Sequence, residues 1–565
     1  MDKRWVFKES DEEKVNSLQQ QLKVNPIICK LLIQRGINTY DEAKKFFRPT
    51  IDDLHDPFLM KDMQKAIDRI VLAISKNERI LIFGDYDVDG TTSVALVYSF
   101  LREIYSNLDY YIPDRYHEGY GISFKGIDYA KETNCTLIIA LDCGIKANDK
   151  IDYANERNID FIICDHHIPG DKVPDAIAIL DPQQFDCNYP YKELSGCGIG
   201  FKLVQAFAIQ HNIPIEKIIP LLDLVVVSIA SDIVPITGEN RVLAFCGLEQ
   251  LNANPRPGLK ALIEITGYST PLSISNIVFG IGPRINAAGR MDDANKAVRM
   301  LVSESVEKAK DGADILQEKN VDRKEIDKKI TLDAIRMLQE DENVANRVTT
   351  VLCSGEWHKG VVGIVASRLL DHYYRPTILL TESNGMLFGS ARSVKNFDIY
   401  EAIKQCDYLL EQFGGHMYAA GLSMLPENFE KFKQRFEEVV KATIKPEQLI
   451  PEIEIDSALE LKDITKNFNN IIKQFAPFGP QNMYPIFMTG KLKNSGKSKI
   501  VGDNHLKLSI KDSNLYNVEA IAFQKGNYFN AIAKGSIFDL CYTIEENNFR
   551  DMKSLQLNVR EIKIH

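Results

Sequence analysis

The chain has 565 residues, 45% of them apolar and 26% charged, which is enough for several domains with cores of ordinary size. A formal net charge of −10 argues against a protein coated in nucleic acid through its overall charge, but is compatible with a local basic groove. No run reaches the roughly 18 apolar residues of a membrane helix, and the first residues lack the apolar core of a signal peptide. Ten cysteines without a C-x-x-C pair indicate neither a zinc knuckle nor a disulfide framework, so we expect a cytoplasmic protein with no membrane segment.

Residues 1–75 predict a helical lead-in, with NPIICKLLIQRGI and YDEAKKFFRP as its helices. From residue 79 onward, short apolar strands alternate with helical patterns. The predicted strands are RILIFG, LDYYIP, TLIIAL, DFIIC and AIAILD. This alternation is typical of βαβ units and predicts a doubly wound parallel sheet within residues 76–290. IIPLLDLVVVSIASDIV predicts a buried helix that runs up to Asp232.

Residues 291–345 contain no proline, and Gly312 is their only glycine. Apolar residues recur there at helical spacing, which predicts a long exposed connecting helix with a break near Gly312. Those apolar residues are Ile326, Ile330, Ala334, Met337 and Leu338. A second, smaller α/β domain is predicted at 346–445, from strands VTTVLC, PTILLT and MLFGSA around the helix GVVGIVASRLL. In residues 446–565, NHLKLSIKD alternates apolar and polar residues, which predicts an OB-like β-barrel.

The stretch ILIFGDYDVDGTTSVAL places Asp85, Asp87 and Asp89 at alternate positions directly after an apolar run. A calcium loop of the EF-hand type would need a glutamate where Leu96 stands, and a helix where RILIFG predicts a strand. Two interpretations remain. The segment is either a solvated acidic turn or part of a metal site at the carboxyl end of a strand, with its other ligands further along the chain.

Three further acidic or histidine clusters follow apolar runs. Asp142 ends LIIALD, Asp165, His166 and His167 follow DFIIC, and Asp232 ends SIASD. Each alone is typical of a cap or a satisfied hydrogen bond, but together at one sheet edge they indicate a shared metal site. Carboxylates with imidazole and without thiolate suit manganese, magnesium or iron, and the histidine favours Mn²⁺ over Mg²⁺. Six or so ligands suit two divalent cations, and hence hydrolysis of a phosphoester or phosphoanhydride.

The segments DYDVDG, LDCG, DHH and SDIVPI, in this order, resemble the successive motifs of the DHH phosphoesterases. The later segments GPRINAAGR, HKGVVGIVASR, GSARS and GGHMYAAG resemble the RecJ branch of that family. This resemblance implies a single-stranded-DNA-specific exonuclease of DNA repair and recombination, which releases 5′-mononucleotides in the 5′→3′ direction by a two-metal mechanism. It implies single-stranded DNA as the substrate, with a single-stranded-DNA-binding protein and a RecQ-type helicase as candidate partners. We expect a monomer.

The resemblance also assigns roles to residues of the acidic clusters. It implies metal ligands at Asp85, Asp87, Asp89, Asp142, His166 and Asp232. Asp142 is the implied bridge between the two cations, and Asp165 the carboxylate that orients the adjacent histidine. His167 is the implied phosphate-contacting residue, so the catalytic set is Asp142, Asp165 and His167.

Substrate-binding positions are implied in other segments of the chain. They are Arg115, Tyr120, Arg284, Asn286, Arg290, His358, Ser390, Arg392 and His416. The arginines suit phosphates because a guanidinium donates two parallel hydrogen bonds, and Tyr120 offers a stacking surface for a base. From the residues alone, the loop around Tyr120 is also compatible with a solvated loop, and FGGHMYAAG with a tight turn before a strand.

Lysines crowd one stretch of the predicted barrel and indicate a groove that follows a nucleic-acid backbone. They are Lys491, Lys493, Lys497, Lys499, Lys507 and Lys511. A lysine-rich edge that resists aggregation would look similar. Two alternative functions remain, a DHH phosphodiesterase for short oligoribonucleotides or cyclic dinucleotides and a non-catalytic DNA-binding scaffold. The predicted barrel and linker argue against the first, and the complete set of metal-ligand residue types argues against the second.

Overall fold

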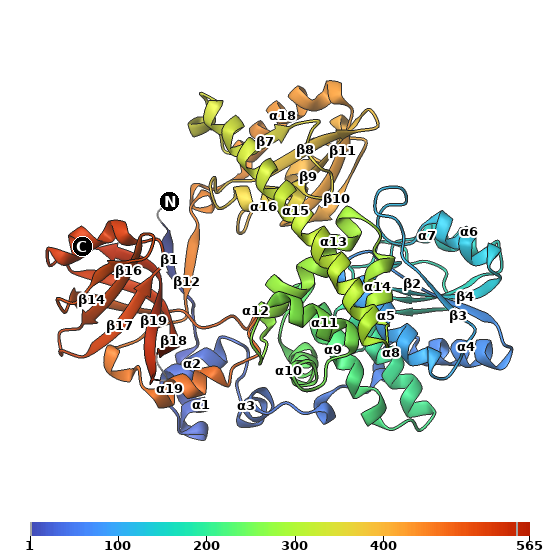
Figure 1. Ribbon diagram of the computed structural model, residues 1–565, viewed down its shortest axis with the longest axis horizontal. Coiled ribbons are helices and arrows are strands. Elements are labelled where there is room, and N and C mark those ends of the chain that lie inside the picture. Colours follow the sequence, from blue (N-terminus) through green and yellow to red (C-terminus); the bar gives the residue numbers. More distant parts are fainter. Residues whose placement is uncertain (1–2, 550–551) are drawn as a thin grey trace. The chain divides into compact units, whose positions relative to one another are not determined.

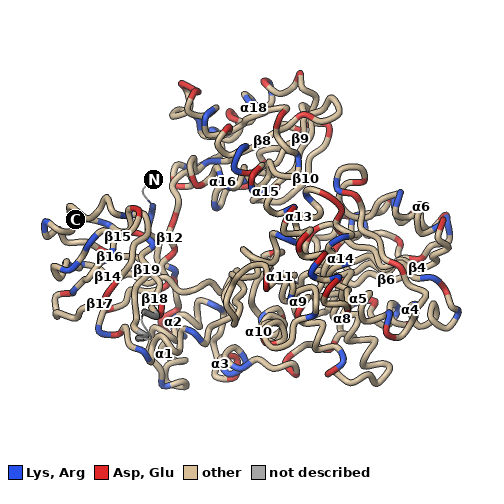
Figure 2. The backbone as a smooth tube through the Cα atoms, in the orientation of Figure 1, with Lys and Arg blue, Asp and Glu red and all other residues tan. Residues whose placement is uncertain are grey.

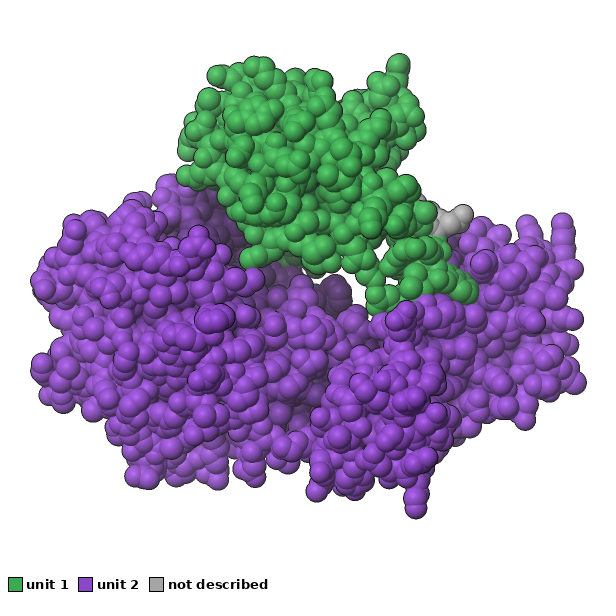
Figure 3. Space-filling view, turned by 180° about the vertical axis from the view of Figure 1, so that it is seen from behind, with its two compact units in different colours: residues 1–6, 318–454 green, residues 7–317, 455–565 purple. Residues whose placement is uncertain are grey.

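The computed structural model describes residues 3–549 and 552–565. The chain forms two compact units (Figure 3). Unit 1 comprises residues 1–6 and 318–454, and unit 2 comprises residues 7–317 and 455–565. The predicted fold class is confirmed: a doubly wound parallel-sheet domain and a β-barrel lie in unit 2, and a second α/β domain lies in unit 1. Among the described residues, no helix is long and apolar enough to cross a membrane.

The parallel sheet of unit 2 has the strand order β3–β2–β4–β5–β6. Figure 1 labels β2, β3 and β4 of this sheet. Its strands are β2 Arg79–Gly84, β3 Leu108–Tyr111, β4 Cys135–Leu141, β5 Asp160–Cys164 and β6 Ala178–Leu180. Ile80 and Ile82 of β2 pack into one apolar cluster, and Leu81 and Phe83 into another. Because both faces are covered by helices, the strands read as continuous apolar runs rather than as alternating patterns.

Helices cover the sheet. They are α4 Met63–Ser75, α5 Val88–Arg102, α6 Phe124–Glu132, α7 Asn148–Asn155 and α8 Gly196–Gln210. Of these, α5, α6 and α7 connect consecutive strands, whereas α4 precedes and α8 follows the strands. The chain runs outward from β2 to β3 in one direction and from β4 to β6 in the other, so the strand order reverses between the neighbours β2 and β4. In an open α/β sheet, ligands bind in the crevice beyond the carboxyl ends of the strands at such a switch point. The fold therefore places a binding crevice where the acidic segments after β2 and β4 lie.

Further helices of unit 2 extend this layer of helices. They are α9 Leu222–Ser231, α10 Gly238–Ala253, α11 Pro257–Thr266, α12 Ile274–Asn276, the π-helix η5 Ile277–Ile281, α13 Gly282–Met291 and α14 Asn295–Leu301. Of these, α9, α13 and α14 pack against α5, and the others pack against α9, α14 or one another. α9 is buried along its length except at its last residue, Ser231. As predicted, it ends directly before Asp232, which caps its carboxyl end.

The N-terminal segment is helical, as predicted, except at its start, where strand β1 Arg4–Phe7 pairs with β12 Glu452–Ile455. The helices that follow are α1 Glu12–Leu22, α2 Pro26–Ile33 and α3 Tyr40–Phe47. Leu18, Leu31 and Phe46 of these helices share one apolar core with the barrel. α4 instead packs into the core of the parallel sheet. The first 75 residues therefore contribute to two cores, that of the barrel and that of the parallel sheet.

The C-terminal barrel has the strand order β13–β14–β18–β19–β17–β16–β15, and an additional pairing of β14 with β16 closes it. Its strands are β13 Ser457–Ala458, β14 Phe487–Asn494, β15 Lys499–Val501, β16 His505–Lys511, β17 Asn517–Ala522, β18 Phe538–Phe549 and β19 Met552–Ile564. Helices α19 Lys466–Lys473 and α20 Phe529–Ala533 accompany them. In β16, Leu506, Leu508 and Ile510 are buried, as the alternating pattern predicts.

The predicted break near Gly312 is wrong, because α15 runs unbroken through Val306–Glu340. A Cβ atom at Gly312 would come within 2.9 Å of the Cβ atom of Met300, so the glycine allows close packing against α14. The interruption lies at residues 302–305 instead, between α14 and α15. The helix is also less exposed than predicted, because Asn320, Arg323 and Asp327 are buried along its unit 1 part.

Unit 1 is built on a mixed sheet with the strand order β10–β11–β9–β8–β7. Its strands are β7 Thr350–Cys353, β8 Thr377–Ser383, β9 Met386–Arg392, β10 Gln412–His416 and β11 Ala419–Met424. Its helices are α16 Val362–Leu369, α17 Ile399–Lys404 and α18 Phe429–Thr443. β7 and β8 are parallel neighbours, and the other neighbours in this sheet are antiparallel.

Candidate metal centre and active site

The acidic clusters of unit 2 converge at the carboxyl edge of the parallel sheet. Asp87 caps the amino end of α5, where its Oδ1 accepts from the N–H of Gly90 at 3.1 Å. A Cβ atom at Gly90 would come within 2.3 Å of the Asp85 carbonyl oxygen, so only glycine allows this tight strand-to-helix turn. Asp142 directly follows β4 with a φ of 60°, which turns its carboxylate out of the strand direction.

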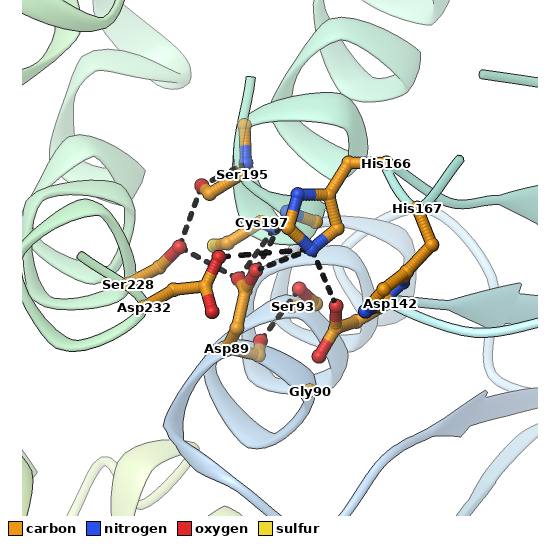
Figure 4. A network of polar contacts seen from close by, with 12 residues as sticks. Asp89, Gly90, Ser93, Asp142, His166, His167, Ser195, Cys197, Ser228 and Asp232 are labelled. Carbon is orange, nitrogen blue, oxygen red and sulfur yellow. Dashed lines mark hydrogen bonds and ion pairs between the residues drawn. The ribbon is translucent and has the colours of Figure 1, made fainter. Parts of the chain in front are cut away.

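Three carboxylates surround the ring of His166 (Figure 4). Its Nε2 lies 3.2 Å from Asp142 Oδ1, 3.6 Å from Asp232 Oδ2 and 3.8 Å from Asp89 Oδ2. Among the described residues, two groups could each hold a metal ion, because the potential ligand atoms within a group all lie within 4.8 Å of one another. The groups are Asp142–His166–His167 and Asp89–His166–Asp232. His166 belongs to both groups, whereas Asp142 belongs to one, so the bridging role of Asp142 stays a prediction.

Asp85 and Asp87 lie beside these groups rather than within them. Asp85 is fully buried, and its Oδ1 accepts from the N–H of Gly121 at 3.1 Å. Its Oδ2 is buried with no hydrogen-bond partner in the described part of the chain. A buried carboxylate oxygen without a donor is unfavourable unless a cation or a proton compensates it.

Burial raises the pKa of Asp85, Asp87, Asp142 and Asp232, and the negative charge of neighbouring carboxylates raises each pKa further. Several carboxylates in one buried place repel one another unless positive charge lies among them. The oxygen and imidazole donors suit Mn²⁺ or Mg²⁺, and the orphaned Asp85 oxygen fits a cation as well.

Asp89 is held by groups that the sequence analysis did not identify. Its Oδ2 accepts from the N–H of Gly196 at 2.7 Å, and its Oδ1 from the N–H of Cys197 at 2.8 Å. The hydroxyl of Ser228 also donates to Oδ1, at 2.6 Å. These donors come from the first turn of α8 and from α9, so only the folded chain brings them to Asp89.

Asp165 is the carboxylate partner of His167. Its Oδ1 lies 2.7 Å from His167 Nδ1 and 2.8 Å from the backbone nitrogen of His166, and its Oδ2 accepts from the N–H of Ile145 at 2.9 Å. Burial alone would raise the pKa of Asp165, but its hydrogen bonds, above all to His167, lower that pKa on balance. Asp165 thus orients the ring of His167, whereas its contact with His166 is a hydrogen bond from the backbone N–H.

Asp181 is a further acidic residue of this edge that the sequence analysis missed. It directly follows β6, is fully buried, and has an Oδ2 without a partner in the described part of the chain. Burial, with a smaller effect of Asp165, raises the pKa of Asp181 to about 7. Its signal was the acid that ends AIAILD, the same pattern that marked Asp142.

The five substrate-binding residues predicted in unit 2 lie on the loop after β3 and on α13. Arg115 stacks over the ring of Tyr86 at 4.8 Å, and Asn286 is half-buried. Arg284 is buried, and its Nη1 donates to the carbonyl of Gly280 at 2.6 Å. The carbonyl of Arg290 accepts from the hydroxyl of Tyr116. The burial of Arg284 leaves its predicted phosphate contact without support here, and the roles of the others stay predictions.

The remaining predicted substrate residues lie in unit 1, where Ser390 and Arg392 form one cluster. Arg392 Nη1 donates to Ser390 Oγ at 2.9 Å, and its Nε donates to Ser367 Oγ at 3.1 Å. A Cβ atom at Gly363, near the amino end of α16, would come within 2.8 Å of Ser390 Oγ and 3.0 Å of Arg392 Nη2. A glycine thus lets the amino end of a helix approach a guanidinium.

Two predicted substrate histidines flank this cluster in the sequence. His358 Nδ1 accepts from the N–H of Gly360 at 3.1 Å, just before α16. His416 is exposed and ends β10 opposite Ala419, so the FGGH segment is a strand of a hairpin. Their predicted contacts with substrate stay predictions.

Both the fold and the site define a metal-dependent phosphoesterase of the DHH class. The profile of the DHH family, N-terminal domain, matches residues 79–229, that of the DHHA1 domain matches residues 345–442, and that of the RecJ OB domain matches residues 455–561. These matches cover the parallel sheet, the mixed sheet and the barrel in turn.

Relatives narrow the class. The chain is 36% identical to the single-stranded-DNA-specific exonuclease RecJ of Bacillus subtilis (strain 168), over 99% of this chain and 71% of that protein. It is 32% identical to the RecJ of Escherichia coli (strain K12), over 95% of this chain and 96% of that protein. The crystal structure of RecJ in complex with Mn²⁺ from Thermus thermophilus matches with a TM-score of 0.85 at 24% identity, over 99% of this chain and 79% of that chain. The chain therefore belongs to the RecJ family of single-stranded-DNA-specific exonucleases.

Proposed function

We propose that the chain hydrolyses phosphodiester bonds of single-stranded DNA from the 5′ end, releases 5′-mononucleotides, and acts in DNA repair and recombination. The observation that carries this proposal is the convergence of Asp89, Asp142 and Asp232 on His166 at the switch point of the sheet, in a chain of the RecJ family. The 5′→3′ direction rests on family resemblance.

Two divalent cations, Mn²⁺ in preference to Mg²⁺, would be held by Asp85, Asp87, Asp89, Asp142, His166 and Asp232. When bound, they would supply Lewis-acid stabilisation of the charge on the phosphate. The chain's own contribution centres on His167, whose Nδ1–H is held by Asp165 at 2.7 Å. Burial lowers the pKa of His167, but the hydrogen bond and the charge of Asp165, together with the charges of Asp232 and Asp89, outweigh it and raise the pKa to about 9. In its protonated form, which these carboxylates favour, the ring can donate to a phosphate or leaving-group oxygen.

In unit 1, Ser390 and Arg392 with the amino end of α16 are proposed to hold the 5′ phosphate. A guanidinium and a hydroxyl supply charge-assisted hydrogen bonds, and the first N–H groups of a helix add further donors. This role would account for a glycine at position 363, because a Cβ atom there would crowd the side chains of Ser390 and Arg392.

An end-labelled oligonucleotide tests the proposal. We expect rapid release of mononucleotide from a 5′ label, on single strands and not on duplex, with Mn²⁺ or Mg²⁺ and not with a chelator. A label released first from the 3′ end would refute the direction. Cleavage confined to di- and trinucleotides would instead identify a phosphodiesterase for short substrates, and binding without cleavage a scaffold.

The barrel is proposed to hold the incoming strand through its lysines. Figure 2 shows Lys and Arg in blue along the barrel near β14, β15 and β16. In the register of the sheet, Lys499 lies opposite Lys507, and Lys493 opposite Lys511. Like charges directly opposite each other destabilise a sheet, and a bound polyanion would offset this repulsion. The pairing therefore supports binding over a role in resisting aggregation alone.

Replacing Lys499 and Lys507 by glutamine should weaken binding of a long single strand and make it less sensitive to salt. The slope of log Kd against log salt should fall by about 1.4, since each phosphate contact contributes about 0.7 for single strands. Fluorescence anisotropy over a salt series measures this slope. The control carries Lys534→Gln and Lys563→Gln, two exposed lysines of the same barrel outside the stretch. Equal slopes for the two double variants would refute the binding role of the stretch.

A single-stranded-DNA-binding protein and a RecQ-type helicase are proposed as partners, because both act on the single strands that such an exonuclease consumes. We propose that the chain works as a monomer in a reducing cytoplasm. The ten cysteines are free thiols in the structure, which fits that compartment.

A further inference from the structure

Tyr120 was predicted to offer a stacking surface for a base, but its hydroxyl lies at the active site. Its Oη is 3.1 Å from His167 Nε2 and 3.3 Å from the carbonyl oxygen of Asp142. Its ring meets the rings of His167 and Tyr86 edge-on, with centroids 5.8 Å and 6.3 Å apart. An edge-on ring with its hydroxyl directed at an imidazole suggests a role other than stacking.

The loop that carries Tyr120 is built to hold it there. Gly119 and Gly121 flank it with φ angles of 88° and 77°, which glycine adopts without strain. The N–H of Gly121 donates to Asp85 Oδ1 at 3.1 Å, so the backbone next to Tyr120 is tied to a predicted metal ligand. Just before this segment, Glu118 accepts from the hydroxyls of Tyr111 and Ser123. These hydrogen bonds order the segment around Tyr120, although Asp114, Tyr116 and His117 of the same loop are exposed to solvent, so neither interpretation of the loop is decided.

The two ring nitrogens of His167 are thereby held from opposite sides. The Asp165 carboxylate accepts only, so Nδ1 carries a hydrogen and Nε2 faces Tyr120. The tyrosine hydroxyl can accept from an Nε2–H while donating to the Asp142 carbonyl, or donate to a bare Nε2. In either arrangement Nε2 has a partner, and the plane of the ring is fixed by two hydrogen bonds rather than by one.

We propose that Tyr120 is a positioning residue for His167, whose hydroxyl holds Nε2 in the orientation from which it meets the reacting phosphate. Because both ring nitrogens have a partner, the plane of the His167 ring is set before DNA arrives and stays set during the reaction. The inference rests on the proposed function, because it presumes that His167 acts on a phosphodiester.

Tyr120→Phe separates positioning from stacking, because it keeps the ring and removes only the hydroxyl. We expect kcat to fall about 10- to 100-fold, the range found when a partner that orients a site ligand is removed, with KM and DNA affinity nearly unchanged. A stacking role predicts the opposite: wild-type turnover for Tyr120→Phe, and weaker DNA binding for Tyr120→Leu. The control is Tyr105→Phe, which removes a hydroxyl bound to the Glu78 carbonyl at 2.6 Å.

A double variant makes the test specific for His167. If Tyr120 acts through His167, Tyr120→Phe should change kcat less than about twofold when His167 is already alanine. The same fall in both backgrounds would overturn the proposal, as would wild-type kcat for Tyr120→Phe alone. If the wild-type chain itself releases no nucleotide from single-stranded DNA, the proposed function fails first. Thermal melts of every variant exclude loss of folding as the cause.

Discussion

Asp142→Asn should leave the protein folded and able to bind single-stranded DNA, while hydrolysis falls about 1,000-fold or more. The bound cations would stabilise the transition state by several kcal/mol, and about 4 kcal/mol corresponds to a 1,000-fold change in rate. Asp142 is one of the ligands expected to hold these cations. Asparagine suits the position because it tolerates the φ of 60° that Asp142 adopts. Single-turnover release of nucleotide measures the rate, and anisotropy measures binding.

The same substitution should raise the melting temperature of the chelator-treated protein. Burial and neighbouring carboxylates raise the pKa of Asp142, so its negative charge is unfavourable in the folded state without metal, and a neutral amide removes it. Added Mn²⁺ should then stabilise the wild type more than the variant. Asp152→Asn is the control, since Asp152 is an exposed acid on α7. Wild-type turnover in Asp142→Asn would contradict the assignment of this carboxylate to the metal centre.

Arg241→Leu should lower the free energy of unfolding by about 3–5 kcal/mol, because three short hydrogen bonds to buried carbonyls are lost at roughly 1–3 kcal/mol each. The Arg241 side chain from α10 donates to the carbonyls of Phe46 and Phe475 at 2.9 and 2.8 Å, and to that of Ala476 at 2.9 Å. Its guanidinium also lies 3.8 Å from the centre of the Phe46 ring. This one side chain therefore ties the helices beside the parallel sheet to α3 and to the segment after α19.

We expect the loss to appear as uncoupling within unit 2. In urea, the barrel and the N-terminal helices of Arg241→Leu should unfold at a lower concentration than the parallel-sheet core. The wild type should show fewer separate unfolding transitions. Arg48→Leu, at a position just after α3, is the comparison variant. A midpoint equal to that of the wild type would mean that water replaces these hydrogen bonds without loss.

Much of the fold follows from patterns in the sequence. The strands β2, β4 and β5 were predicted because parallel strands covered on both faces need continuous apolar runs, and their ends were marked by acids. β1 was missed because four residues give too short a pattern, and only its pairing with β12 makes it a strand. Gly312 was read as a break because glycine weakens helices, yet its close contact with Met300 decides its role.

For the site, residue types and their order already indicated an acidic metal centre for phosphoester chemistry. Three carboxylate segments and a histidine pair each follow an apolar run, and this combination is typical of a metal site. Only the tertiary structure decided what each side chain contacts. In the structure, Asp89 accepts from backbone N–H groups of α8, and Asp165 is hydrogen-bonded to the His167 ring. Arg284 is buried, and the Tyr120 hydroxyl contacts His167. The physical reason is that a sequence records which donors and acceptors exist. Hydrogen bonding and burial depend on groups that lie far along the chain and become neighbours only on folding.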